Sequence, residues 1–97
     1  MNTYVILRRD GWRDTEDLEQ AAERSRAVGE QMPEDVRWIR SYVIEESAGS
    51  VGTVCIYQAT GPEAIRRHAD AADLAVSEII EVAGTVIVRP DPVGVES

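Results

Sequence analysis

The chain has 97 residues, of which 43% are hydrophobic, and a formal net charge of −8. This length suits one domain with a modest core, and the negative charge repels both a phosphate backbone and an anionic membrane surface. We therefore expect no nucleic-acid partner and no membrane partner. The ten basic residues are all arginines, so neither a Schiff-base lysine nor a P-loop lysine is available.

Cysteine usage and the apolar pattern indicate a cytoplasmic protein. No stretch approaches the roughly 18 apolar residues of a membrane span, and residues 1–4 lack the basic region and apolar core of a signal peptide. The single cysteine, Cys55, cannot form an internal disulfide, so stability has to come from packing, which in so small a core is often supplemented by oligomerisation.

The first predicted elements are a strand and an amphipathic helix. Thr3–Arg8 is rich in β-branched and aromatic residues and is followed by a turn signal at Asp10–Gly11. Asp14 or Thr15 can cap the helix, and Pro33 ends it. The apolar stripe of this helix consists of Leu18, Ala21, Ala22, Ser25, Val28 and Met32.

Two strands and a second helix follow. The sequence predicts two strands, Val36–Glu45 and Val51–Ala59, joined by the polar loop Glu46–Ser50. The sequence Thr60-Gly61-Pro62-Glu63 predicts a helix start with a capping-box Thr and Glu. The run Ile79–Arg89 predicts the last strand.

The element order is β, α, β, β, α, β, which predicts a ferredoxin-like α+β fold of the dimeric α/β-barrel type. Both helices would cover one face of a four-stranded antiparallel sheet and leave the other face open. We expect residues 1–90 to form the domain and residues 91–97 to form a flexible tail. The open face predicts a homodimer, because sheets packed face to face would cover it.

Pairing Glu46 with Val51 across the hairpin divides the two middle strands into two faces. The aliphatic face, suited to the helices, holds Ile39, Ser41, Val43, Val54 and Ile56. The open, aromatic and polar face holds Trp38, Arg40, Tyr42, Thr53, Cys55 and Tyr57.

The open face carries the predicted ligand-binding residues, which are Trp38, Arg40, Tyr42 and Tyr57. Either these aromatic residues form the core of a dimer interface, or they line a pocket between subunits in which Arg40 holds an anionic ligand.

Two reactive side chains stand alone in the sequence. Cys55 lies in a strand without a CxxC partner and reads as a buried, inert thiol. His68 falls within the apolar stripe of the second helix, where it is either a hydrogen-bonded packing residue or a residue with a ligand or acid/base role. Because Cys55 is predicted on the open face and His68 under the helices, we expect the sheet to separate them.

Three segments resemble a bacterial family of domains of unknown function. They are Val36–Val43, with Trp-x-x-Ser-Tyr-Val, then Cys55–Ala59, and then Glu63–Ala69, with its His-Ala pair. One member of that family is described as a nickel-binding, dimeric protein with a ferredoxin-like fold. The resemblance covers residues 1–90.

The resemblance implies a site at which His68, Cys55 or Tyr57 holds Ni²⁺ or another divalent metal, with His68 as the metal ligand. This chain has Gln58 where an acidic residue is usual, which removes one ligand, and its hairpin is longer. Three functions therefore stay open: a metal-binding or small-ligand-binding homodimer, an enzyme or small-molecule-binding module that uses the open sheet face, and a structural or interaction protein without chemistry.

Overall fold

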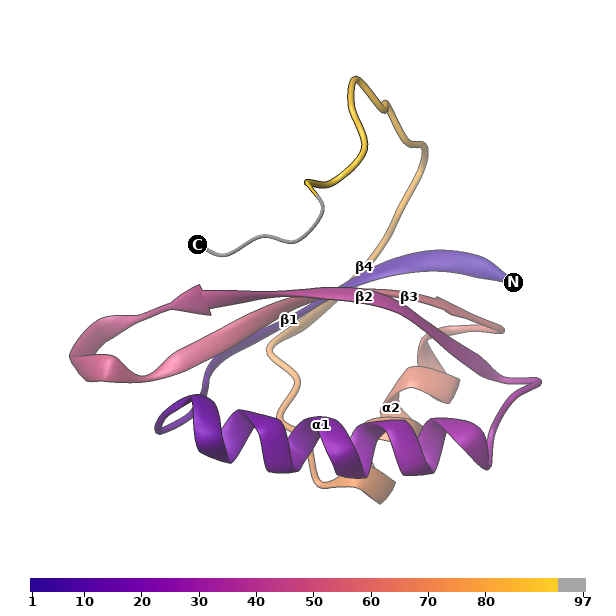
Figure 1. Cartoon of the computed structure of the whole chain (residues 1–97). Coiled ribbons are helices and arrows are strands. Elements are labelled where there is room, and N and C mark those ends of the chain that lie inside the picture. Colours follow the sequence, from indigo (N-terminus) through magenta and orange to yellow (C-terminus); the bar gives the residue numbers. More distant parts are fainter. Residues whose placement is uncertain (93–97) are drawn as a thin grey trace.

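The computed structural model describes residues 1–92, which form a four-stranded antiparallel sheet with two helices on one face (Figure 1). The elements are β1 (Asn2–Trp12), α1 (Thr15–Glu30), β2 (Val36–Glu45), β3 (Val51–Ala59), α2 (Pro62–Ala72) and β4 (Glu78–Glu81), with a short 3-10 turn at Ser47–Gly49. The strand order is β2-β3-β1-β4. The predicted ferredoxin-like fold is confirmed. Of the predicted tail, residues 93–97 lie outside the described residues.

The helices begin where the sequence places them, but only one of them by the expected cap. At α1, the Asp14 carboxylate accepts a hydrogen bond from the backbone N–H of Asp17 at 2.9 Å. At α2, Gly61 occupies the cap position without a side-chain hydrogen bond, so the predicted capping box is wrong. The Thr60 backbone N–H donates instead to the Asp35 carbonyl at 3.0 Å, which ties the end of β3 to the start of β2.

The hairpin between β2 and β3 pairs one residue away from the predicted register. Val51 faces Glu45 rather than Glu46, because the Glu46 N–H bonds to the Ser50 carbonyl and so belongs to the turn. A second shift occurs between Trp38 and Arg40, where Ile39 is an extra residue on β2. Each shift reverses the face of the residues beyond it on one strand relative to the other.

The predicted assignment of the β3 side chains to the two faces of the sheet is therefore wrong. Thr53, Cys55 and Tyr57 are buried beneath the helices, whereas Val54 and Ile56 lie on the open face and are only half-buried. On β2, Trp38 also packs against the core under the helices. Arg40 and Tyr42 stay on the open face, as predicted, opposite Ile56 and Val54.

The first and last strands of the chain, β1 and β4, differ from the prediction in length. β1 continues to Trp12 through an irregularity after Arg8, with Asp10 at a φ of 49°. β4 ends at Glu81, which pairs with Tyr4 of β1, and one further hydrogen bond follows it, from the Val82 N–H to the Thr3 carbonyl at 2.9 Å. The predicted strand Ile79–Arg89 is thus largely a non-strand segment.

The segment after β4 returns to the opposite edge of the sheet (Figure 1). Asp91 accepts hydrogen bonds from the guanidinium of Arg40 and from the hydroxyl of Tyr42, both on β2. Val86, Ile87 and Val88 are 92%, 75% and 82% exposed, so this segment does not pack on the sheet. Within residues 1–92, neither helix is long and apolar enough to cross a bilayer.

Candidate functional site

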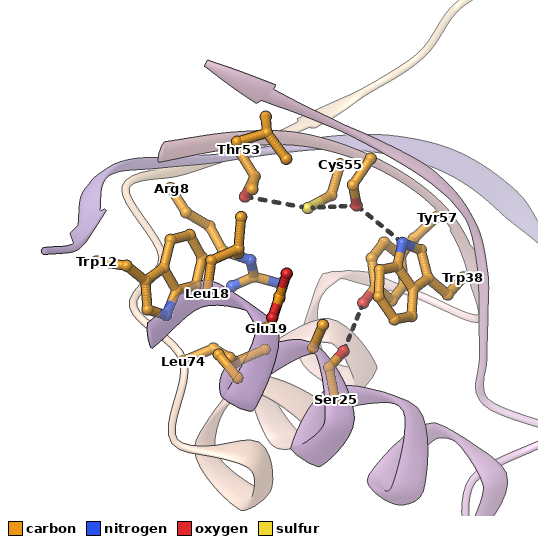
Figure 2. A pocket seen from close by; sticks show the side chains of 14 residues that line it. Arg8, Trp12, Leu18, Glu19, Ser25, Trp38, Thr53, Cys55, Tyr57 and Leu74 are labelled. Carbon is orange, nitrogen blue, oxygen red and sulfur yellow. Dashed lines mark hydrogen bonds between the residues drawn. The ribbon is translucent and has the colours of Figure 1, made fainter. Parts of the chain in front are cut away.

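A cavity of about 200 Å³ lies between the helix-covered face of the sheet and α1 (Figure 2). Strand alternation on β1 and β3 directs Arg8, Thr53, Cys55 and Tyr57 towards it. The cavity reaches the surface, because the exposed side chain of Glu19 forms part of its wall. Its walls are formed by Arg8, Trp12, Leu18, Glu19, Ala21, Ala22, Ser25, Trp38, Ser41, Val43, Thr53, Cys55, Tyr57 and Leu74.

A row of hydrogen bonds crosses the sheet side of the cavity (Figure 2). The Trp38 indole N–H donates to the Ser41 hydroxyl at 2.8 Å, and that hydroxyl donates to the Cys55 sulfur at 3.0 Å. The Cys55 thiol in turn donates to the Thr53 hydroxyl at 3.3 Å. Cys55 is therefore a buried, hydrogen-bonded free thiol, which suits a structural role better than nucleophilic chemistry.

Tyr57 and His68 form a second buried group next to this row. Tyr57 stacks on Trp38 with ring centroids 6.1 Å apart, and its hydroxyl lies 3.1 Å from the Ser25 hydroxyl. His68 tilts against Tyr57 at 5.6 Å between ring centroids. Burial raises the pKa of Tyr57 and lowers that of His68, because it disfavours the charged form of each.

His68 has one satisfied ring nitrogen and one unsatisfied one. Its Nε2 lies 3.0 Å from the Ser25 carbonyl oxygen, which can only accept, so Nε2 carries the proton. Its Nδ1 is buried and has no hydrogen-bond partner within residues 1–92. His68 also borders a second hollow, of about 470 Å³, near the C-terminal end of α1.

Arg8 lines the cavity but was not among the site residues predicted from the sequence. Its side chain is fully buried, at 2% exposure, and Nη1 donates to the Ala75 carbonyl at 2.7 Å. Nη2 is buried without a partner, and no carboxylate of the described chain lies within 4.0 Å of the guanidinium. The alternation Tyr4, Ile6, Arg8, in which two core residues precede the arginine on one face, was the signal that could have found it.

The predicted ligand-binding residues do not share one face. Trp38 and Tyr57 line the cavity under the helices. Arg40 and Tyr42 lie on the open face, 48% exposed at the Arg40 side chain and 45% exposed at Tyr42, and both bond to Asp91. The hairpin slip and the extra residue Ile39 together explain the separation.

The expected separation of Cys55 and His68 by the sheet is also wrong, since both are buried on the helix side. They nevertheless have different neighbours: Cys55 bonds to Ser41 and Thr53, and His68 to Ser25. In the described part of the chain no three His, Cys, Asp or Glu side chains are grouped so that they could hold a metal ion. The donor set of residues 1–92 therefore does not fit a resident metal centre.

Comparison with known proteins places the chain in a family. The family model described as "Nickel responsive protein SCO4226-like" matches residues 4–82. The crystal structure of SCO4226 from Streptomyces coelicolor A3(2) is similar in fold, with a TM-score of 0.68 and 21% sequence identity over 87% of this chain and 99% of that one. No curated protein sequence matches the chain. Because the family model covers most of its length, the chain belongs to the nickel-responsive SCO4226-like family.

Proposed function

We propose that this protein is a homodimeric small-ligand-binding protein whose ligand lies in the cavity between the sheet and α1. The observation that carries this proposal is the cavity itself, which is walled by aromatic rings and by a few oriented polar groups (Figure 2). Such a combination is typical of ligand pockets, in which apolar walls supply affinity and the polar groups fix orientation.

Ordinary packing is a weaker explanation for this cavity. Protein interiors are close-packed, with few voids larger than a water molecule. A space of about 200 Å³ that opens to the surface beside Glu19 exceeds such a void. A cavity of roughly 150 Å³ lined by apolar side chains can take up benzene, so this one admits a small organic molecule.

Tryptophan fluorescence tests the proposal, because the protein has two tryptophans, Trp12 and Trp38, and both line the cavity. Benzoate and its neutral isostere benzamide serve as probes, and we expect at least one of them to change the emission saturably. Ala22→Phe fills the cavity from α1 and is expected to abolish this response. Ala27→Phe, at an exposed position on the same helix, is the matched control and should keep it. No response of the native protein to either probe would contradict the proposal.

The homodimer rests on the open face of the sheet. This face carries a central aliphatic patch made by Val5, Leu7, Val54, Ile56 and Ile80, which no helix covers (Figure 1). Within this patch Ile80 is 42% exposed, and on the same face Tyr42 is 45% exposed. A contiguous apolar surface of this kind favours burial against a second copy of the chain, through the same patch on both subunits.

Nickel binding is a second candidate function, supported by the description of the family and by the unpaired Nδ1 of His68. One buried imidazole supplies a single nitrogen ligand, so binding through it alone would be weak. Calorimetric titration of the metal-free protein with Ni²⁺ decides between the two functions, with His68→Ala as the control. Heat that saturates in the native protein and disappears in the variant would support this second candidate.

We further expect no duplex DNA among the partners, since the net charge is −8. A reducing, cytoplasmic setting suits the one free cysteine.

A further inference from the structure

The strongest unexplained feature of the cavity is the guanidinium of Arg8. It comes from the central strand β1, and Figure 2 shows it directed into the space among Trp12, Leu18 and Glu19. The hydrogen bond from Nη1 to the Ala75 carbonyl fixes its orientation, at 2.7 Å. The other terminal nitrogen, Nη2, is buried and has no acceptor in the described chain.

A buried arginine stays charged, so it needs an anion or a full set of acceptors. The four ion pairs in the described chain join other residues, and none includes Arg8. A carbonyl oxygen satisfies one N–H but supplies no negative charge. The protein therefore buries a cation whose counter-ion is not among its own neighbouring groups.

Glu19 is the one carboxylate among the residues that line the cavity. It lies in α1 at an exposed position and forms no ion pair with Arg8 within 4.0 Å. Water therefore solvates the Glu19 side chain, whereas the Arg8 guanidinium is buried in the wall of the cavity. An anion entering the cavity can meet Arg8 without displacing an internal salt bridge.

We propose that the cavity binds a small apolar monocarboxylate whose carboxylate group pairs with Arg8. This inference rests on the proposed ligand-binding function and adds the chemical class of the ligand. Arginine holds a carboxylate through directed, charge-assisted hydrogen bonds, and Nη2 is free to donate them. The body of the ligand then packs against Trp12, Trp38 and Leu74. With a volume of about 200 Å³, the cavity suits a molecule about the size of benzoate.

The test compares benzoate with benzamide, because the two have the same shape and differ in charge. In the native protein we expect benzoate to bind at least tenfold more tightly, read from tryptophan emission and confirmed by calorimetry. In Arg8→Met, which keeps the length and apolar stem of the side chain, this preference should disappear while benzamide binding stays within threefold. Circular dichroism and thermal unfolding establish that the variant folds. Inorganic phosphate, an anion without an apolar body, should bind more weakly than benzoate.

The outcomes separate this inference from the proposed function. If benzamide binds as tightly as benzoate in the native protein, the cavity is a ligand site but Arg8 is not its anchor, and the inference is overturned. If neither probe binds, the proposed function and the inference both fall. Binding of phosphate as tight as that of benzoate would identify a general anion site and would also overturn the assigned ligand class.

Glu19→Gln tests the alternative that Arg8 and Glu19 pair inside the protein. If the ligand is the counter-ion of Arg8, removing this carboxylate leaves the affinity for benzoate within threefold of the native value. A large gain in affinity would mean that Glu19 occupies Arg8 as an internal counter-ion in the native protein, against the inference.

Discussion

At the scale of single residues, burial determines the charge of His68. The ring is 1% exposed, donates to the Ser25 carbonyl and packs on Tyr57. Burial has the largest effect and lowers its pKa, and the nearby positive charge of Arg8 lowers the pKa further. The hydrogen bond to Ser25 opposes this by raising the pKa. The native protein therefore keeps His68 neutral at pH values where an exposed histidine is protonated.

This predicts a pH-dependent contribution to stability. Above the unfolded pKa of about 6.5, both states hold a neutral ring, and the contribution is fully present. As the pH falls below that value the unfolded chain binds a proton that the folded protein excludes, so the free energy of unfolding decreases by at most about 1.4 kcal/mol per pH unit. His68→Gln keeps a donor towards Ser25 and cannot titrate. Urea unfolding at pH 7.5 and pH 5.5 should show a smaller loss for the variant, and equal losses would contradict the prediction.

At the scale of elements, Glu46 joins the β2–β3 hairpin to β1. Its carboxylate accepts hydrogen bonds from Arg9 Nη2 at 2.8 Å and from Arg9 Nε at 3.0 Å, and also from the backbone N–H of Asp10. These hydrogen bonds, that of Arg9 first, hold the pKa of Glu46 below its usual value. The contact is made where the pairing of β1 is irregular and where the β2–β3 hairpin turns. It therefore connects two segments that the backbone hydrogen bonds of the sheet alone do not hold in place.

Gly52 provides the space for this contact, and its replacement is predicted to destabilise the hairpin. A Cβ at this position would overlap the Arg8 carbonyl oxygen and the Glu46 carboxylate. Gly52→Ala should therefore reduce the free energy of unfolding by about 1–3 kcal/mol, as overpacking against backbone does. Gly84→Ala, where a Cβ meets nothing within 4 Å, is the control and should change it little. Equal midpoints of urea unfolding for the two variants would show that the hairpin accommodates the added methyl group without loss of stability.

At the scale of the whole molecule, the open face of the sheet is an apolar surface that neither helix of residues 1–92 covers. The segment after β4 crosses towards β2 and is held there by Asp91, but Val86, Ile87 and Val88 remain exposed. The described part of the segment therefore stands away from the open face of the sheet (Figure 1). A second copy is the occupant that we propose for this space.

Ile56→Arg places a charge at the centre of the patch, opposite Val5 of β1, and is predicted to give a monomer. Native protein at micromolar concentration should show twice the mass of one chain in light scattering. Ala27→Arg adds the same charge on an exposed position of α1 and should leave the dimer intact. A native mass of one chain would mean that the segment after β4 closes over the sheet instead.

The sequence by itself determined which elements form and where most of them begin. Hydrophobic periodicity and the turn residues are local signals, so α1 after Asp14, β2 at Val36–Glu45 and β3 at Val51–Ala59 could be predicted from them. The order of these elements was sufficient to predict the ferredoxin-like fold.

Only the tertiary structure decided which side chains face the helices. Both faces of β3 carry apolar residues, Cys55 and Tyr57 on one and Val54 and Ile56 on the other, so its alternation does not distinguish them. The face depends on a register that one turn residue, Glu46, and one extra residue, Ile39, each shift by one position. For the same reason the sequence did not reveal that Trp38 and Tyr57 line one cavity with Arg8. From the sequence alone a charged residue such as Arg8 is expected at the surface. Its burial depends on strand pairing and helix packing, which are long-range contacts.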